Sequence, residues 1–265
     1  MKAIIISLFV LLPSYIFSQS FSEKQALEDL NYLVNQIKTY NPALYIYNPD
    51  YDADVSTYME SIKGEHDHFE LFKKVSKIVA MSNEGHFALG NWEDCVHKGF
   101  QSNEFSYLPM RLEVMDNRLF IREIYWESEL KSGQEIVSIN NKKSSEIIEE
   151  LYDYLPADGE IVTYKQGLLS TGFNWLYYIY MDRPERFVIK TESGETDTIK
   201  AITLQQMRDW VKDNPLETPN NEMKFDESND VYATKFEPTR AWLKLKSFNR
   251  GQIETLGLKS NKFYK

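Results

Sequence analysis

Apolar positions change their spacing twice along the chain, and each change predicts a different kind of structure. Over residues 21–92 they recur every three or four residues, which is the period of a helix with one buried face. The first apolar stripe consists of Leu27, Leu30, Val34 and Ile37. Ser22 and Gln25 have the capping-box spacing that begins a helix, and Pro42 ends it. We therefore predict a helical N-terminal region.

Two more helices are expected in this region. The apolar positions of the second are Val55, Met59 and Ile62. The third is expected to start at Asp67, whose carboxylate can cap it, and to run into SNEGHF (82–87). Gly85 fits the position just after a helix end, where a positive φ is tolerated. His86 would then stand at the corner between this helix and a strand.

Between about residues 105 and 202 the apolar period changes to two, which is typical of half-buried strands. Asp-Asn, Asn-Asn and Ser-Gly pairs offer turns between these strands. The strand EIVSI (135–139) is followed by a predicted helix over SEIIEELYDYL (145–155), which Ser144 or Ser145 can cap. Helices followed by such strands indicate an α+β fold.

The last part of the chain begins with a polar stretch. Residues 213–231 contain Pro215 and Pro219 and little apolar material, so we expect a linker or an exposed loop, which we place at residues 203–230. VYATKF (231–236) and AWLKLKSF (241–248) then predict two strands joined at Glu237-Pro238-Thr239.

The first 20 residues have the features of a secretory signal peptide. Lys2 gives a positive start, an apolar run over residues 3–17 follows, and Ser18 and Ser20 suit a cleavage site. The run is short for a membrane span and has a polar exit, although an uncleaved N-terminal anchor is the alternative. We therefore expect an exported protein, either periplasmic or extracellular.

Composition narrows the expected partners. The formal net charge of −10 argues against nucleic acid and anionic membrane surfaces. No later apolar run is long enough to span a bilayer, so we expect no integral membrane segment after signal cleavage. Cys95 is the single cysteine, so the fold has no internal disulfide and must rest on its core.

Three groups of residues suggest metal or nucleophilic chemistry, and each has a simpler explanation. Residues 65–68, Glu-His-Asp-His, are zinc-type ligands, but their spacing does not suit one helical face and helix capping explains them. Ser170 lacks the Gly-x-Ser-x-Gly pattern and is expected to be structural. Cys95 and His97 alternate but lack partners. We expect no metal and no cofactor.

His86 is the strongest candidate for catalysis. A general base needs a fixed position and a pKa near the working pH, and a corner between helix and strand supplies the fixed position. The alternative is a histidine that packs at a helix end and bonds to the backbone.

Three stretches, in this order, resemble the tail-specific (C-terminal processing) protease family of serine peptidases, above all its tricorn-like branch. NEGH (83–86) is similar to the family's Gly-His corner. SGQEIVSINNKKSSEIIEEL (132–151) is similar to its PDZ-like consensus, and RAWLKLKSFNRG (240–251) looks like the first strand of its catalytic domain. The resemblance covers most of the chain after the signal peptide.

The resemblance implies a division into four parts after the signal peptide. These are an N-terminal helical region (21–92), a PDZ-like domain (105–202), a linker (203–230) and the incomplete start of a mixed α/β catalytic domain (231–265).

It also implies roles for single residues. His86 would be the general base of a Ser-His pair, and Gly133 and Ser247 would help to bind a peptide or protein substrate. PDZ-like domains bind a peptide as an added edge strand, although a domain that only braces the core is the alternative. The family's nucleophilic serine follows a later strand, and nothing like it occurs before Lys265. The chain therefore resembles a front portion that is inactive alone.

Two functions follow from these observations. The chain is the front portion of an exported serine-type peptidase, or it is a non-catalytic secreted PDZ-like peptide-binding protein. The reading frame after Lys265 discriminates, because a glycine-flanked serine there favours the peptidase. A degenerate family member that serves as a scaffold is a third possibility. If the catalytic domain is incomplete, Trp242 and Phe248 lack neighbouring strands, and the last ~35 residues form at most a lone hairpin.

Overall fold

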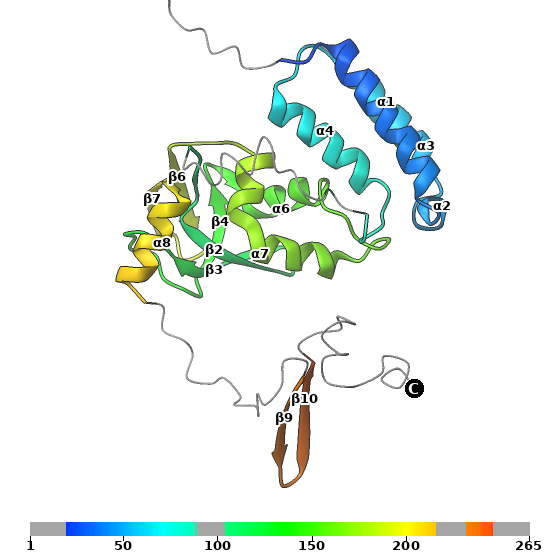
Figure 1. The fold of residues 1–265 in the computed structure, drawn as a ribbon. Helices are drawn as coiled ribbons and strands as arrows, with labels where there is room; N and C mark the ends of the chain where they lie inside the picture. The colour runs from blue at the N-terminus through cyan, green and yellow to red at the C-terminus, as the bar shows by residue number, and fades with distance from the viewer. Residues whose placement is uncertain (1–19, 88, 90–103, 216–231, 246–265) are drawn as a thin grey trace, which may run out of the picture. The chain divides into compact units, whose positions relative to one another are not determined.

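Helices come first along the chain and antiparallel strands follow, so the α+β prediction is confirmed. The structure is a computed structural model, and it describes residues 20–87, 89, 104–215 and 232–245. The chain divides into two units, residues 1–214 and 215–265. In the first unit, the N-terminal helices form a layer in which α4 contacts α7, and α7 lies along the main sheet (Figure 1).

The helical layer has its own core. Its helices are α1 (Glu23–Tyr40), α2 (Leu44–Tyr47), α3 (Tyr51–Glu60) and α4 (His68–Ala80). The residues they bury against one another include Leu30, Ile37, Leu44, Tyr51, Val55, Ile62 and Ile78. Of the apolar positions that the helical period selects, Leu30, Ile37, Val55 and Ile62 are buried, whereas Leu27, Val34 and Met59 are partly buried against them.

The predicted helix starts are confirmed. The Ser22 hydroxyl accepts the N–H of Gln25, and the Gln25 side chain accepts the N–H of Ser22. Asp67 Oδ1 accepts the N–H of Glu70 at 2.8 Å. Each bond satisfies a backbone donor that the first turn of a helix leaves without an intrahelical partner.

The main sheet of the first unit has the order β2-β3-β4-β6-β7, with β5 paired to β4. Its strands are β2 (Met110–Met115), β3 (Arg118–Ile124), β4 (Glu135–Ile139), β5 (Lys142–Lys143), β6 (Arg186–Thr191) and β7 (Thr196–Lys200). A small second sheet pairs β1 (Ser106–Tyr107) with β8 (Ile202–Thr203). The predicted turns are present. Their positive-φ residues are Asp116, Asn117, Asn140, Asn141 and Gly194.

Three helices accompany these sheets: α6 (Ser144–Tyr152), α7 (Val162–Tyr180) and α8 (Leu204–Asp213). The predicted capping of α6 by Ser144 or Ser145 is wrong. Lys143 is the N-cap residue and makes no side-chain cap. Ser144 lies inside the helix, and its buried hydroxyl donates to the carbonyl of Ile136 at 2.6 Å, which ties α6 to β4.

The predicted linker does not begin at residue 203. Thr203 and Gln206 form a second capping box, and α8 runs from there to Asp213 with Met207 buried. The rest of the predicted linker, residues 216–230, lies outside the described residues.

The second unit contains the predicted hairpin, β9 (Tyr232–Glu237) paired antiparallel with β10 (Arg240–Leu245). Pro238 and Thr239 form its two-residue turn. Phe236, Trp242 and Leu243 are exposed to 78, 38 and 64 %. The prediction of a two-stranded hairpin with an exposed Trp242 is therefore confirmed, whereas Phe248 lies outside the described residues.

Helix α7 bends at Gly172, whose φ of −139° is not helical. The Trp175 ring lies over this glycine, and a Cβ there would lie 2.0 Å from Trp175 Nε1. Gly167, one turn earlier, has nothing within 4 Å of the same position. A methyl group therefore fits at Gly167, where the space is open, and clashes with the Trp175 ring at Gly172.

We expect Gly167→Ala to raise the free energy of unfolding by about 0.5–1 kcal/mol, because alanine costs less backbone entropy in an exposed helix. Gly172→Ala should lower it by about 1–3 kcal/mol, because the methyl group displaces the Trp175 ring. Urea denaturation of both variants measures these changes. Equal effects of the two substitutions would contradict the described packing of α7.

Candidate functional site

His86 lies in a turn, and its side chain is exposed. The prediction that α4 runs to Gly85 is wrong, because the helix ends at Ala80. The residue with positive φ is Asn83, at 50°, and Gly85 is not in that region. The chain therefore turns at Asn83 after the end of α4. A second turn follows, and His86 lies two residues after its start.

Backbone hydrogen bonds hold this turn against the loop that precedes α7. The N–H of Gly85 donates to Asp158 Oδ1 at 2.7 Å, and the N–H of Gly159 donates to the carbonyl of Asn83 at 2.8 Å. A Cβ on Gly85 would lie 3.1 Å from Asp158 Oδ1. Gly85 is thus explained by the close approach of Asp158, and the imidazole of His86 is attached to a fixed backbone.

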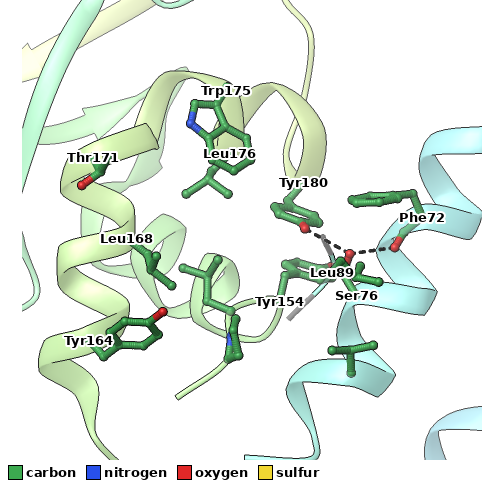
Figure 2. A pocket seen from close by; sticks show the side chains of 13 residues that line it. Phe72, Ser76, Leu89, Tyr154, Tyr164, Leu168, Thr171, Trp175, Leu176 and Tyr180 are labelled. Carbon is green, nitrogen blue, oxygen red and sulfur yellow. Dashed lines mark hydrogen bonds between the residues drawn. The ribbon is translucent and has the colours of Figure 1, made fainter. Parts of the chain in front are cut away.

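A cavity of about 200 Å³ lies between α4 and α7. Figure 2 shows Phe72 and Ser76 of α4 on one side and Leu168, Thr171 and Trp175 of α7 on the other. Val79, Leu89, Tyr154, Leu155, Pro156, Tyr164, Leu176 and Tyr180 complete the lining. None of the described residues that line it is charged.

Aromatic rings form the inner wall of the cavity. Tyr154 and Tyr180 stack with centroids 4.5 Å apart and an interplanar angle of 1°. The Tyr180 hydroxyl donates to Ser76 Oγ at 3.0 Å, and Ser76 Oγ donates to the carbonyl of Phe72 at 2.9 Å (Figure 2). Burial raises the pKa of Tyr154 and of Tyr180 to about 12. These two phenols are therefore neutral at physiological pH, and the wall is apolar.

The cavity and the His86 turn are built by the same two segments. Val79 and Leu89, which line the cavity, flank the turn, and Pro156 lies two residues before Asp158. The bond from Gly85 to Asp158 therefore joins the turn that carries His86 to the segment that contributes Pro156 to the cavity wall.

Side chains already occupy both edges of the main sheet. Helix α7 lies along β2, and the buried N–H of Val114 donates to Ser170 Oγ at 2.9 Å. On β7, Asp197 accepts the N–H of Thr198 and the Ser128 hydroxyl. A peptide that adds to either edge as a strand has to displace these contacts. Ser170 is structural, as predicted.

Of the two predicted substrate-binding residues, the structure describes only Gly133, and it lies away from the His86 turn. Gly133 has a φ of 88°, and its N–H donates to the carbonyl of Ile121 at 2.7 Å, within the sheet. Ser247 lies outside the described residues, as do Cys95 and His97. The assignment of residues 105–202 to a PDZ-like domain stays a prediction.

The Glu-His-Asp-His segment ties the start of the chain to α4. His66 exchanges two backbone hydrogen bonds with Phe21, at 2.8 and 2.9 Å. Its side chain is buried, and Nε2 has no hydrogen-bond partner among the residues that the structure describes. Burial is the main cause that lowers the pKa of His66. In the described ranges, no group of three or more His, Cys, Asp or Glu side chains could hold a metal ion.

Sequence reasoning missed Asp158, the cavity wall and Lys165. Burial lowers the pKa of Lys165, and its ammonium donates to the carbonyl of Tyr152 at 2.9 Å, which joins α7 to the end of α6. Neither Asp158 nor the stacked tyrosines have a local sequence signal, because their partners are far away along the chain.

Among the described residues, no helix is long and apolar enough to cross a bilayer.

No family model and no curated protein matches this sequence. Two crystal structures of CPAF, a chlamydial serine protease, are similar to it: the mature protein and a serine-to-alanine mutant. Each is 12 % identical, with a TM-score of 0.43 over 67 % of this chain. The chain spans about a third of the length of those structures, 34 and 33 % respectively. The likeness is a distant one, and the function proposed below does not rest on it.

We expect Ser170→Ala to lower the free energy of unfolding by about 1–3 kcal/mol, because it leaves the buried N–H of Val114 without an acceptor. Thr171→Ala is the matched control, since the Thr171 hydroxyl is exposed and bonds only within α7, to Gly167. Chemical denaturation of the two variants tests this. A Ser170→Ala protein as stable as the control would show that the N–H of Val114 on β2 does not depend on the Ser170 hydroxyl of α7.

The buried His66 side chain is expected to make the folded protein less stable in mild acid. Because burial lowers its pKa in the folded state below the unfolded value of 6.5, folding favours the neutral imidazole. Lys74 acts in the same direction, whereas Glu70 and Glu23 oppose it. The contribution is present above about pH 6.5 and is lost as the pH falls through the folded pKa.

The melting temperature measured from pH 7.5 to pH 5 should therefore fall less in His66→Gln than in the unchanged protein. His68→Gln is the control, because it removes an imidazole from the same segment and keeps His66. An identical pH profile for His66→Gln and the unchanged protein would rule out His66 as the titrating group.

Proposed function

We propose that this chain is the front portion of an exported serine-type peptidase of the tail-specific protease family, and that His86 is its general base. The observation that carries the proposal is an exposed imidazole on a turn whose Gly85 bonds to Asp158, with Val79 and Leu89 on either side of that turn lining an apolar cavity. The substrate class is a peptide or an unfolded segment of an exported protein.

The sequence supplies the rest of the support. The Gly-His turn, the PDZ-like stretch and the strand RAWLKLK follow one another in the family's order. The signal-like first 20 residues support export. The nucleophilic serine is not among the residues assigned here, and we propose that it belongs to a segment that follows the hairpin in the complete gene product.

In this proposal His86 acts by proton transfer. Its imidazole takes the hydroxyl proton of the serine as that oxygen attacks the peptide carbonyl, and it returns the proton to the leaving amine. The chain contributes positioning, because the bonds of Gly85 and Gly159 hold the turn from both directions. A base on a loop without such bonds would be held less well in the orientation for proton transfer, and catalysis would be slower.

A non-catalytic peptide-binding protein is the second candidate. The observation in its favour is that His86 makes no hydrogen bond to any hydroxyl group of the described residues. Such a protein would bind unstructured peptides and leave them intact, with or without His86.

We expect His86→Gln in the complete gene product to lower kcat/KM on a labelled unfolded protein by about 10²–10⁴-fold, which is the contribution of a general base. The fall should lie in kcat, since glutamine keeps much of the size and polarity of the side chain. Steady-state kinetics with a fluorogenic casein measures it.

His68→Gln is the matched control and should retain activity. Equal rates for His86→Gln and the unchanged protein would remove His86 from the mechanism. A complete gene product that binds casein without cleaving it would favour the binding protein instead.

A further inference from the structure

We propose that the cavity between α4 and α7 binds one large apolar side chain of a peptide, of the size of phenylalanine or leucine. The identity of that peptide as a substrate rests on the proposed function; the binding of the side chain does not. The site would give the protein a preference for one residue in an extended peptide whose backbone passes His86.

The size of the cavity selects a single side chain. An engineered protein cavity of about 150 Å³ is large enough for benzene, so a cavity of about 200 Å³ accepts a phenyl ring with its methylene group. An amphipathic helix needs a groove with several anchor positions, which a cavity of this size does not offer.

The chemistry of the wall selects an apolar group. The polar atoms nearest the inner wall already bond to each other, through Tyr180, Ser76 and the carbonyl of Phe72. None of the described lining residues is charged, so a carboxylate or an ammonium group entering the cavity would lose its hydration without compensation. The flat stack of Tyr154 and Tyr180 offers an aromatic ligand a surface for offset or edge contacts.

The position of the cavity connects it to His86. Figure 2 shows Leu89 and Tyr154 at the side of the cavity near α4. Leu89 lies three residues after His86, and Tyr154 lies four residues before Asp158, which holds the turn. A side chain in the cavity would therefore bring its own backbone to the segments that carry and hold the turn of His86.

The test is peptide binding by calorimetry. The probes are acetyl-Ala-Ala-Phe-Ala-Ala-amide, the same peptide with leucine or aspartate at the centre, the all-alanine peptide, and toluene. We expect the phenylalanine and leucine peptides to bind about 10- to 100-fold more tightly than the all-alanine peptide, which is the gain from burying such a side chain. The aspartate peptide should bind no better than the all-alanine peptide.

Two variants fill the cavity, and one controls for the added ring. Leu168→Trp blocks its centre and Thr171→Phe narrows its rim, and either should remove the preference for phenylalanine. Val162→Trp adds the same bulk to an exposed position of the same helix, outside the lining, and should keep the preference. Thr171 is exposed, so Thr171→Phe tests the site even if Leu168→Trp fails to fold.

Each outcome decides one proposal. A phenylalanine preference that survives Thr171→Phe overturns the cavity assignment, and so does binding of toluene without binding of the phenylalanine peptide. If the preference is lost in the filled variants while His86→Gln leaves peptidase activity unchanged, the cavity assignment stands and the catalytic role of His86 fails. If His86→Gln abolishes activity and the filled variants keep the preference, the catalytic role of His86 stands and the cavity assignment fails.

Discussion

The turn after α4 and the loop before α7 are held together by the contact between Gly85 and Asp158. A charged carboxylate accepts the glycine N–H, and the neighbouring Gly159 returns a hydrogen bond to Asn83. The two bonds run in opposite directions between segments more than 70 residues apart. They fix how the turn after α4 meets the loop before α7. The turn that carries His86 and the segment that contributes Pro156 to the cavity wall are joined by this contact.

The cavity is a consequence of how α4 and α7 meet. Helix α7 bends at Gly172, where the Trp175 ring replaces a side chain, and its first half remains along β2 through Ser170. The second half turns Tyr180 toward Ser76 of α4. Two helices that diverge on either side of a bend leave space between them, and large aromatic residues line that space instead of filling it.

The local features of the fold were predictable because each depends on neighbouring residues. The capping box at Ser22 and the cap at Asp67 each join residues three positions apart, and the Asn-rich turns need only residues that tolerate positive φ. The features that were predicted wrongly depend mainly on contacts between residues far apart along the chain. Gly85 resembled a helix end because glycine suits that position, whereas its reason is the approach of Asp158. The start of α8 had a local signal in Thr203 and Gln206, which the polar composition of the segment concealed. The cavity has no sequence signal at all, because two segments far apart along the chain build it.

The central claim is that the His86 turn and the apolar cavity form one peptide site. Intermolecular nuclear Overhauser effects between the protein and acetyl-Ala-Ala-Phe-Ala-Ala-amide measure this most directly. The account predicts contacts from the phenyl ring to the methyl groups of Leu168 and Leu89, together with contacts from the peptide backbone to the imidazole of His86. A phenyl ring that contacts these leucines while the backbone stays away from His86, or a peptide bound at another surface, would contradict it.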